Sequence, residues 1–140
     1  MSFILKLDQL ASQKIKMIEG INHYNLRSDE LTMNKLKDFY INVVGLSLGK
    51  RPPFKSKGFW LNAKGKDVLH LSSTKNNDIK DHHVNSTFDH MAFSASNISH
   101  YEKILTDNNI KYSYREVPEI RTKQLFFKDP VGNGIELIFI

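Results

Sequence analysis

The sequence predicts an α+β protein made of two βαβββ modules whose strands form a curled mixed sheet, with an extra helix at the N-terminus. Two observations support this prediction. Each half of the chain has the pattern of a strand, a helix and three further strands. The halves also repeat, because His23 and His90 both precede a helix, and His70 and Glu136 follow them by 47 and 46 residues. Such internal repetition indicates two copies of one module.

Composition indicates one soluble globular domain. The 140 residues are 40% hydrophobic and 25% charged, which is ordinary for such a domain. There is no cysteine, so any metal must be held by nitrogen and oxygen ligands. No apolar run is long enough for a signal peptide or a membrane span, and we expect a cytoplasmic protein without a membrane partner. The net charge of +5 is spread along the chain, which favours a role in solubility over nucleic-acid binding.

The first module is predicted to span residues 18–73, after an amphipathic helical appendage over residues 1–17. A strand over 18–26 leads to Ser28 or Asp29, either of which can cap a helix over 30–44 that ends at Gly45. Three strands are expected near 46–51, 58–63 and 67–73.

The second module is predicted to span residues 87–140, after a polar linker over 74–85. Its first strand covers 87–94, and Ser96 or Asn97 caps a helix over 98–109. The remaining strands are expected near 112–117, 121–128 and 134–140. The two modules together form one domain over residues 18–140.

The repeated polar residues predict a metal site. Alternate side chains of a strand share a face, so His23, His70, His90 and Glu136 each interrupt a strand whose neighbouring residues favour the core. Burying these groups without partners is costly, and a bound cation removes that cost. A single histidine here would be read as an ordinary strand residue. The matched spacing of all four favours ligation of one metal ion.

Three imidazoles and a carboxylate suit a divalent transition metal, namely Zn, Fe(II), Mn, Ni or Co, rather than calcium or magnesium. A closed, purely structural zinc site is one alternative. Another is a triad of His23, His90 and Glu136, as in non-haem iron oxygenases. His70 is then either a fourth ligand or an acid–base group.

The expected pairing of residues across each β-hairpin predicts which side chains form the walls of the pocket. A turn over 63–67 that pairs Asn62 with Val68 places Trp60 opposite His70. Pairing Lys128 with Gly134 likewise places Phe126 opposite Glu136. Trp60 and Phe126 would then bind a planar or apolar substrate, and Arg27, on the His23 face, would bind an anionic group. A register slip of one residue would instead bury both aromatic rings under the helices.

Three segments resemble the signature segments of the vicinal-oxygen-chelate superfamily. They are INHYNL at 21–26, FDHMAF at 88–93 and DPVGNGIEL at 129–137. That superfamily includes glyoxalase I, extradiol dioxygenases, fosfomycin-resistance thiol transferases, methylmalonyl-CoA epimerase and the metal-free bleomycin-resistance proteins. The resemblance covers residues 18–140 and implies paired modules around a metal cleft that is open to substrate. It also implies a homodimer.

The implied chemistry is Lewis-acid catalysis on a small substrate that chelates the metal through two adjacent oxygens. An isomerase or lyase would use Glu136 as a base, with His70 as the second candidate catalytic residue. Histidine at both ligand positions of the first module departs from glyoxalase I and disfavours lactoylglutathione chemistry. A dioxygenase and a thiol transferase are the other enzymatic alternatives. A drug-sequestering protein of the bleomycin-resistance type is the non-enzymatic one.

Overall fold

The fold is a pair of βαβββ modules, as predicted. The structure, a computed structural model, describes residues 17, 19–75, 88–118 and 120–140. The first sheet has the order β1 (Tyr24–Ser28), β4 (Lys66–Ser73), β3 (Gly58–Ala63) and β2 (Ser47–Leu48). The second has the matching order β5 (His90–Ser94), β8 (Gly134–Phe139), β7 (Thr122–Lys128) and β6 (Ser113–Val117). In each sheet the first strand runs parallel to the last strand of its module, and the other pairs are antiparallel.

Parts of the prediction fall outside this description. The helical appendage predicted over residues 1–17, apart from Met17, and most of the linker predicted over 74–85 lie outside the described residues. Within the described part of the chain, no helix is long and apolar enough to cross a membrane.

Each module contributes one helix, and local chemistry sets its ends. Helix α2 (Glu30–Phe39) begins after Asp29, whose carboxylate accepts the Thr32 amide at 2.8 Å. A π-helical turn, η1 (Tyr40–Val44), continues it and ends at Gly45, where φ is +93°. A left-handed residue at this position is typical of glycine and terminates the helix. Helix α3 (Ile98–Asp107) begins after Asn97.

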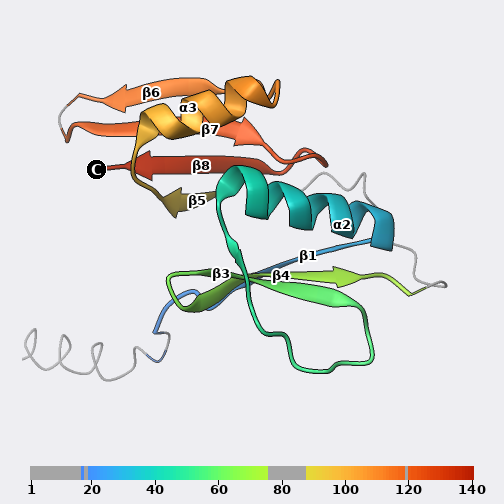
Figure 1. Ribbon diagram of the computed structural model, residues 1–140. Helices are drawn as coiled ribbons and strands as arrows, with labels where there is room; N and C mark the ends of the chain where they lie inside the picture. The colour runs from blue at the N-terminus through green and yellow to red at the C-terminus, as the bar shows by residue number, and fades with distance from the viewer. Residues whose placement is uncertain (1–16, 18, 76–87, 119) are drawn as a thin grey trace, which may run out of the picture.

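The core lies between the two sheets. The inner faces carry fully buried leucines such as Leu69 and Leu125, and α2 and α3 fill the angle between the sheets (Figure 1). The modules are joined across this core by a hydrogen bond from the Tyr40 hydroxyl to the Asp129 carboxylate, 2.8 Å long. A second bond runs from the Tyr101 hydroxyl to the backbone oxygen of Val44 at 2.9 Å. The two modules therefore share one core.

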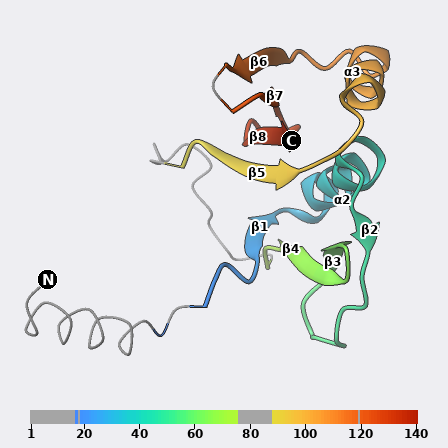
Figure 2. The ribbon, with the colours of Figure 1, turned by 90° about the vertical axis from the view of Figure 1, so that its left-hand side faces the viewer.

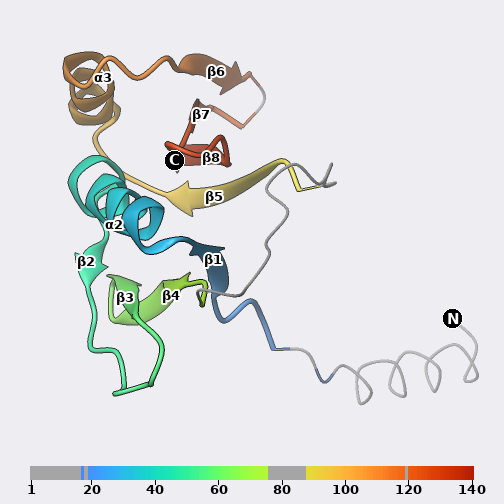
Figure 3. The same cartoon turned by 90° about the vertical axis from the view of Figure 1, so that its right-hand side faces the viewer.

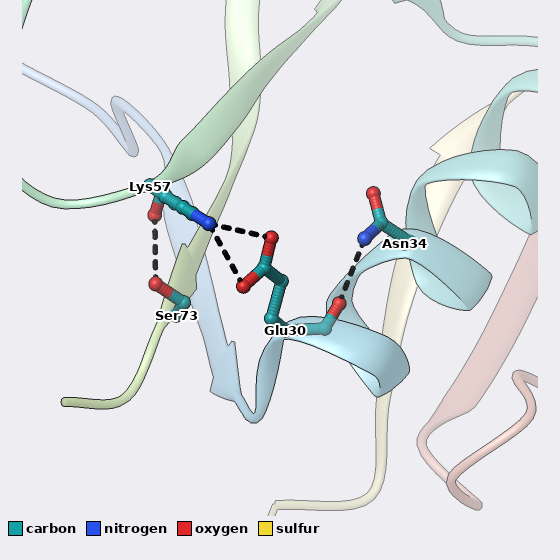
Figure 4. A network of polar contacts seen from close by, with 4 residues as sticks. All are labelled: Glu30, Asn34, Lys57 and Ser73. Atoms are coloured by element: carbon teal, nitrogen blue, oxygen red, sulfur yellow. Dashed lines mark hydrogen bonds and ion pairs between the residues drawn. The ribbon is translucent and has the colours of Figure 1, made fainter. Parts of the chain in front are cut away.

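A surface network ties the start of α2 to the first sheet (Figure 4). The Lys57 ammonium donates to both carboxylate oxygens of Glu30, at 2.9 and 3.0 Å. Ser73 donates to the Lys57 backbone oxygen at 3.3 Å, and Asn34 donates to the Glu30 backbone oxygen at 3.0 Å. The Lys57 and Glu30 side chains are exposed, so their ion pair adds little stability.

The expected curled sheet around one cleft is not formed by the described residues of a single chain. The two sheets are separate four-stranded sheets, with β1 and β5 as edge strands. We call the side of each sheet turned away from α2 and α3 its outer face. Because the helices occupy the angle between the sheets, the two outer faces point in different directions (Figures 2 and 3).

The hairpin registers decide which side chains reach the outer faces. Trp60 pairs with His70, and Phe126 pairs with Glu136, so both predicted pairings are confirmed. The predicted pairing of Asn62 with Val68 is wrong. Asn62 pairs with Asp67 instead, beyond a register shift at Leu61/Asn62. The connection is a tight turn with positive φ at residues 64 and 65, and the register shift compensates for its shorter length.

Candidate functional site

The outer face of the first sheet carries a pair of histidines. His70 lies in the middle of β4 opposite Asn25, and His23 lies two residues before Asn25 on the same side. The two imidazole rings are stacked, with centroids 3.7 Å apart and planes 14° from parallel. Partial burial, and then the neighbouring His23, lower the pKa of His70 below its usual value. The neutral form that can bind a metal is therefore favoured at His70.

The outer face of the second sheet carries a histidine and a carboxylate. His90 opens β5, and its Nε2 lies 2.9 Å from Oε2 of Glu136 on the neighbouring strand β8. Glu136 is only 5% exposed, and its other oxygen accepts the Gln124 amide at 2.6 Å. Nδ1 of His90 lies 2.7 Å from Oδ2 of Asp89. The hydrogen bond to Asp89 and the charge of Glu136 raise the pKa of His90.

The four predicted ligands thus form two pairs on two sheets. Within the part of the chain that the structure describes, no three His, Cys, Asp or Glu side chains lie close enough to hold a metal ion. The outer faces that carry the pairs do not face each other in one chain (Figure 2). The fold therefore brings His23 to His70 and His90 to Glu136, but it does not bring the pairs together.

The donor chemistry of both pairs fits a divalent transition metal. Two imidazoles in one pair, and an imidazole with a carboxylate in the other, are ligands that zinc, iron and manganese accept. Asp89 on His90 and Gln124 on Glu136 are the kind of partners that orient ligands around a metal. Each pair alone supplies two ligands, so a complete shell requires both pairs.

Aromatic rings adjoin both pairs. The Trp60 ring stacks on His70 with centroids 4.2 Å apart and planes 7° from parallel. Phe54 lies 6.1 Å from Trp60, and the Arg51 guanidinium lies 4.8 Å from the centre of the Phe54 ring. The side chains of Arg51, Phe54, Trp60 and His70 therefore contact one another in sequence.

On the second sheet, Phe126 meets His90 edge to face, with centroids 5.9 Å apart. The Arg115 guanidinium lies 5.3 Å from the centre of the Phe126 ring. Arg27 is exposed on β1, opposite Ser72. The three residues predicted to contact substrate are thus on or beside the strands that carry the ligand pairs.

Sequence reasoning missed Gln124, Phe54 and Arg51. Gln124 lies two residues before Phe126 on the same strand, so the parity used for Phe126 also places Gln124 on the outer face. Phe54 and Arg51 belong to the loop that flanks Pro52 and Pro53, and no periodic pattern fixes the direction of loop side chains. Of these three residues, only Gln124 could have been placed at the site from the sequence.

The chain belongs to the Glyoxalase/Bleomycin resistance protein/Dioxygenase superfamily, whose family model matches residues 20–137. This match, together with the paired modules, confirms the resemblance found in the sequence. A comparison with curated proteins gave no match.

Several solved structures share the fold of this chain. A lactoylglutathione lyase from Agrobacterium tumefaciens is 20% identical with a TM-score of 0.61, over 89% of this chain and 96% of that one. A mutant of the fosfomycin resistance protein FosX from Listeria monocytogenes, in complex with Mn(II) and 1S,2S-dihydroxypropylphosphonic acid, is 20% identical. Its TM-score is 0.59, over 86% of this chain and 92% of that one. The antibiotic binding protein TnmS3 from Streptomyces sp. CB03234 is also 20% identical. Its TM-score is 0.62, over 88% of this chain and 97% of that one. At this identity the likeness shows the fold alone.

Proposed function

We propose that this chain is a divalent-metal-dependent enzyme that acts on a small substrate through two adjacent oxygens. The proposed cofactor is one transition metal ion per site, drawn from Zn, Fe(II), Mn, Ni and Co. The reaction is an isomerase or lyase step, a dioxygenation or a thiol transfer. The proposal includes a homodimer in the cytoplasm. It is supported by superfamily membership and by the chemistry of the two ligand pairs.

One observation carries the proposal: each ligand pair lies on or beside an edge strand that, among the described residues, has a strand partner on one side only. His23 directly precedes β1, and His90 begins β5, and both strands are edges of their sheets. Edge strands with free backbone groups favour pairing with another chain. If β1 of one chain meets β5 of a second copy, the histidine pair of one meets His90 and Glu136 of the other. The site is then complete only in the dimer.

In this site His23, His70, His90 and Glu136 would hold the metal. The bound ion supplies Lewis-acid stabilisation of negative charge on the chelating oxygens. Gln124 fixes the Glu136 carboxylate, which is the candidate base, and His70 is the candidate acid–base group if it does not ligate. Trp60 and Phe126 would exclude water around the substrate, and Arg27 would bind an anionic part of it.

Subunit complementation tests this arrangement. His70→Ala destroys the pair on the first sheet, and Glu136→Ala destroys the pair on the second. Each homodimeric variant should lose tight metal binding, whereas a purified mixed dimer of the two should regain about one of the two sites, because one intact pair from each chain still meets. Metal content by elemental analysis and mass by light scattering are the measurements.

The matched control is His100→Ala, which removes a histidine from α3 and leaves both pairs intact. It should bind metal as the unaltered protein does. A mixed dimer that binds no metal, while the unaltered protein binds it, would contradict the shared site. An unaltered protein that takes up none of the five metals would contradict the metal-dependent function itself.

A metal-independent binding protein is the second candidate. The fold is shared with TnmS3, an antibiotic binding protein, and one end of the second sheet holds a cavity of about 500 Å³. Cavities of this size accommodate drug-sized molecules. Tight binding of an organic ligand by protein treated with chelator, together with absence of metal uptake, would favour this function.

A further inference from the structure

We infer that the cavity at one end of the second sheet binds the anionic group of a small apolar ligand through Lys111 and Lys128. The anion is a carboxylate or a phosphonate. The cavity encloses about 500 Å³, and its lining includes His90, Lys111, Tyr112, Phe126, Lys128 and Gly134. Because His90 is one of the proposed ligands, the inference rests on the proposed function and specifies the class of its substrate.

Strand register aligns these residues in one row. His90 on β5 pairs with Gly134 on β8, and Gly134 pairs with Lys128 on β7. Ser113 on β6 pairs with Phe126, and Lys111 lies two residues before the start of β6. Paired residues of neighbouring strands lie on the same face. Lys128 is therefore on the row that begins at His90, and Lys111 lines the same cavity beside it.

The two ammonium groups are unpaired within the part of the chain that the structure describes. Among the described residues, neither Lys111 nor Lys128 forms an ion pair or a side-chain hydrogen bond. Both side chains are exposed. Two like charges that line one cavity repel each other. An anion bound between them would remove this repulsion.

Gly134 lies in the cavity lining between His90 and Lys128 and lets the backbone of β5 approach β8 closely. A Cβ atom at this position would collide with the backbone oxygen of Asp89 and lie 3.0 Å from Cβ of His90. No side chain can therefore project from the middle of the row.

The remaining lining selects an apolar body. Phe126 and the core-packed residues Ile110, Tyr112, Phe127 and Ile135 line the same cavity as the lysines. Asp89 is the carboxylate in the lining, and it is engaged with His90 at 2.7 Å. The cavity lining therefore carries two positive lysine side chains and one carboxylate, which is already bonded to His90. This charge balance favours a negative ligand. Its anionic group would lie beside His90, which places the rest of the molecule near the proposed metal.

Calorimetric titration of chelator-treated, full-length protein tests the site without its metal. Phenylphosphonate and benzoate are the anionic probes and distinguish the two anion types, and benzyl alcohol is the neutral probe. At least one anion should bind, and benzyl alcohol should bind much more weakly. In the double variant Lys111→Gln/Lys128→Gln, the Kd for the bound anion should rise about tenfold or more, since two charge-assisted contacts are lost.

Lys35→Gln, on the exposed surface of α2 and outside the cavity lining, is the matched control and should leave the Kd unchanged. The charge-preserving variant Lys111→Arg/Lys128→Arg should bind the anion within a few-fold of the unaltered protein. Circular dichroism establishes that each variant is folded. Equal anion binding by the unaltered protein and the glutamine variant, or equal binding of anion and alcohol, would overturn the inference. Metal uptake is measured on the same protein after metal is added back. Normal metal uptake without anion binding would show that the anion site fails while the proposed metal site holds.

Discussion

Trp60 and His70 face each other across the β3–β4 hairpin, with ring centroids 4.2 Å apart and ring planes within 7° of parallel. His23 extends the stack on the far side of His70 at 3.7 Å. Trp60 is the only tryptophan in the sequence. Its fluorescence therefore reports on the histidine pair that we propose as half of a metal site.

Metal binding should change the emission of Trp60. An ion that binds His70 alters the charge and orientation of the imidazole against which the indole stacks. Titration with Zn(II) or Mn(II) should give a saturable change in the unaltered protein and none in His23→Ala or His70→Ala. The control His100→Ala should behave as the unaltered protein. Constant Trp60 emission, in a sample whose metal content rises with the titration, would place the ion away from His70.

His70 should lose its proton at a lower pH than His90 in the metal-free protein. Partial burial and His23 lower the pKa of His70, whereas Asp89 and Glu136 raise that of His90. Between the two midpoints His70 is neutral and His90 is charged. As pH falls, protons should therefore displace metal first at His90. Histidine NMR signals followed across a pH titration measure the order of the two midpoints, and the reverse order would contradict the prediction.

Gln124→Ala should weaken metal binding. The Gln124 amide holds one oxygen of Glu136 at 2.6 Å and leaves the other toward His90 at 2.9 Å. Loss of such an orienting partner typically costs about tenfold or more in metal affinity. Lys123→Ala, at the neighbouring exposed position on the opposite face of β7, is the control. Competition with a metal indicator measures both affinities, and equal values would exclude a positioning role for Gln124.

Tyr40→Phe should destabilise the protein by about 1–3 kcal/mol, because it leaves a buried carboxylate without one donor. The Tyr40 hydroxyl donates to Asp129, which is 5% exposed and also accepts two backbone amides of the turn that follows. Denaturant unfolding measures the change. Tyr114→Phe removes an exposed hydroxyl bond to Glu116 and should change stability by less than about 0.5 kcal/mol. A similar, small effect of both variants would show that Tyr40 does not hold the modules together.

The DPVGNG run at 129–134 illustrates how a motif and a tertiary contact combine. The sequence predicted a turn there, and the structure confirms it with bonds from Val131 and Asn133 to the Asp129 side chain. The bond from Tyr40, 89 residues away, was not predictable. A turn follows from the local preferences of Asp, Pro and Gly, whereas a contact between modules depends on how their helices pack.

The sequence by itself determined the two modules, both helices with each cap narrowed to two adjacent residues, and the pairing of Trp60 with His70; the structure selects Asp29 and Asn97 as the caps. Periodicity, capping chemistry and hairpin parity are local, so they act over a few residues and can be read directly. The same local rules missed the tight turn at residues 64 and 65. The register shift at Leu61/Asn62 compensates for the shorter turn, so the pairing of Trp60 with His70 is the same with either turn.

The relative placement of the modules was decided only by the tertiary structure. Matched spacing predicted that His23, His70, His90 and Glu136 meet, but spacing does not say whether they meet within one chain or between two. Packing of α2 and α3 in the angle between the sheets turns the two ligand faces apart and leaves β1 and β5 as edges. That outcome depends on burial of apolar surface shared by both modules, which no segment of the sequence encodes alone.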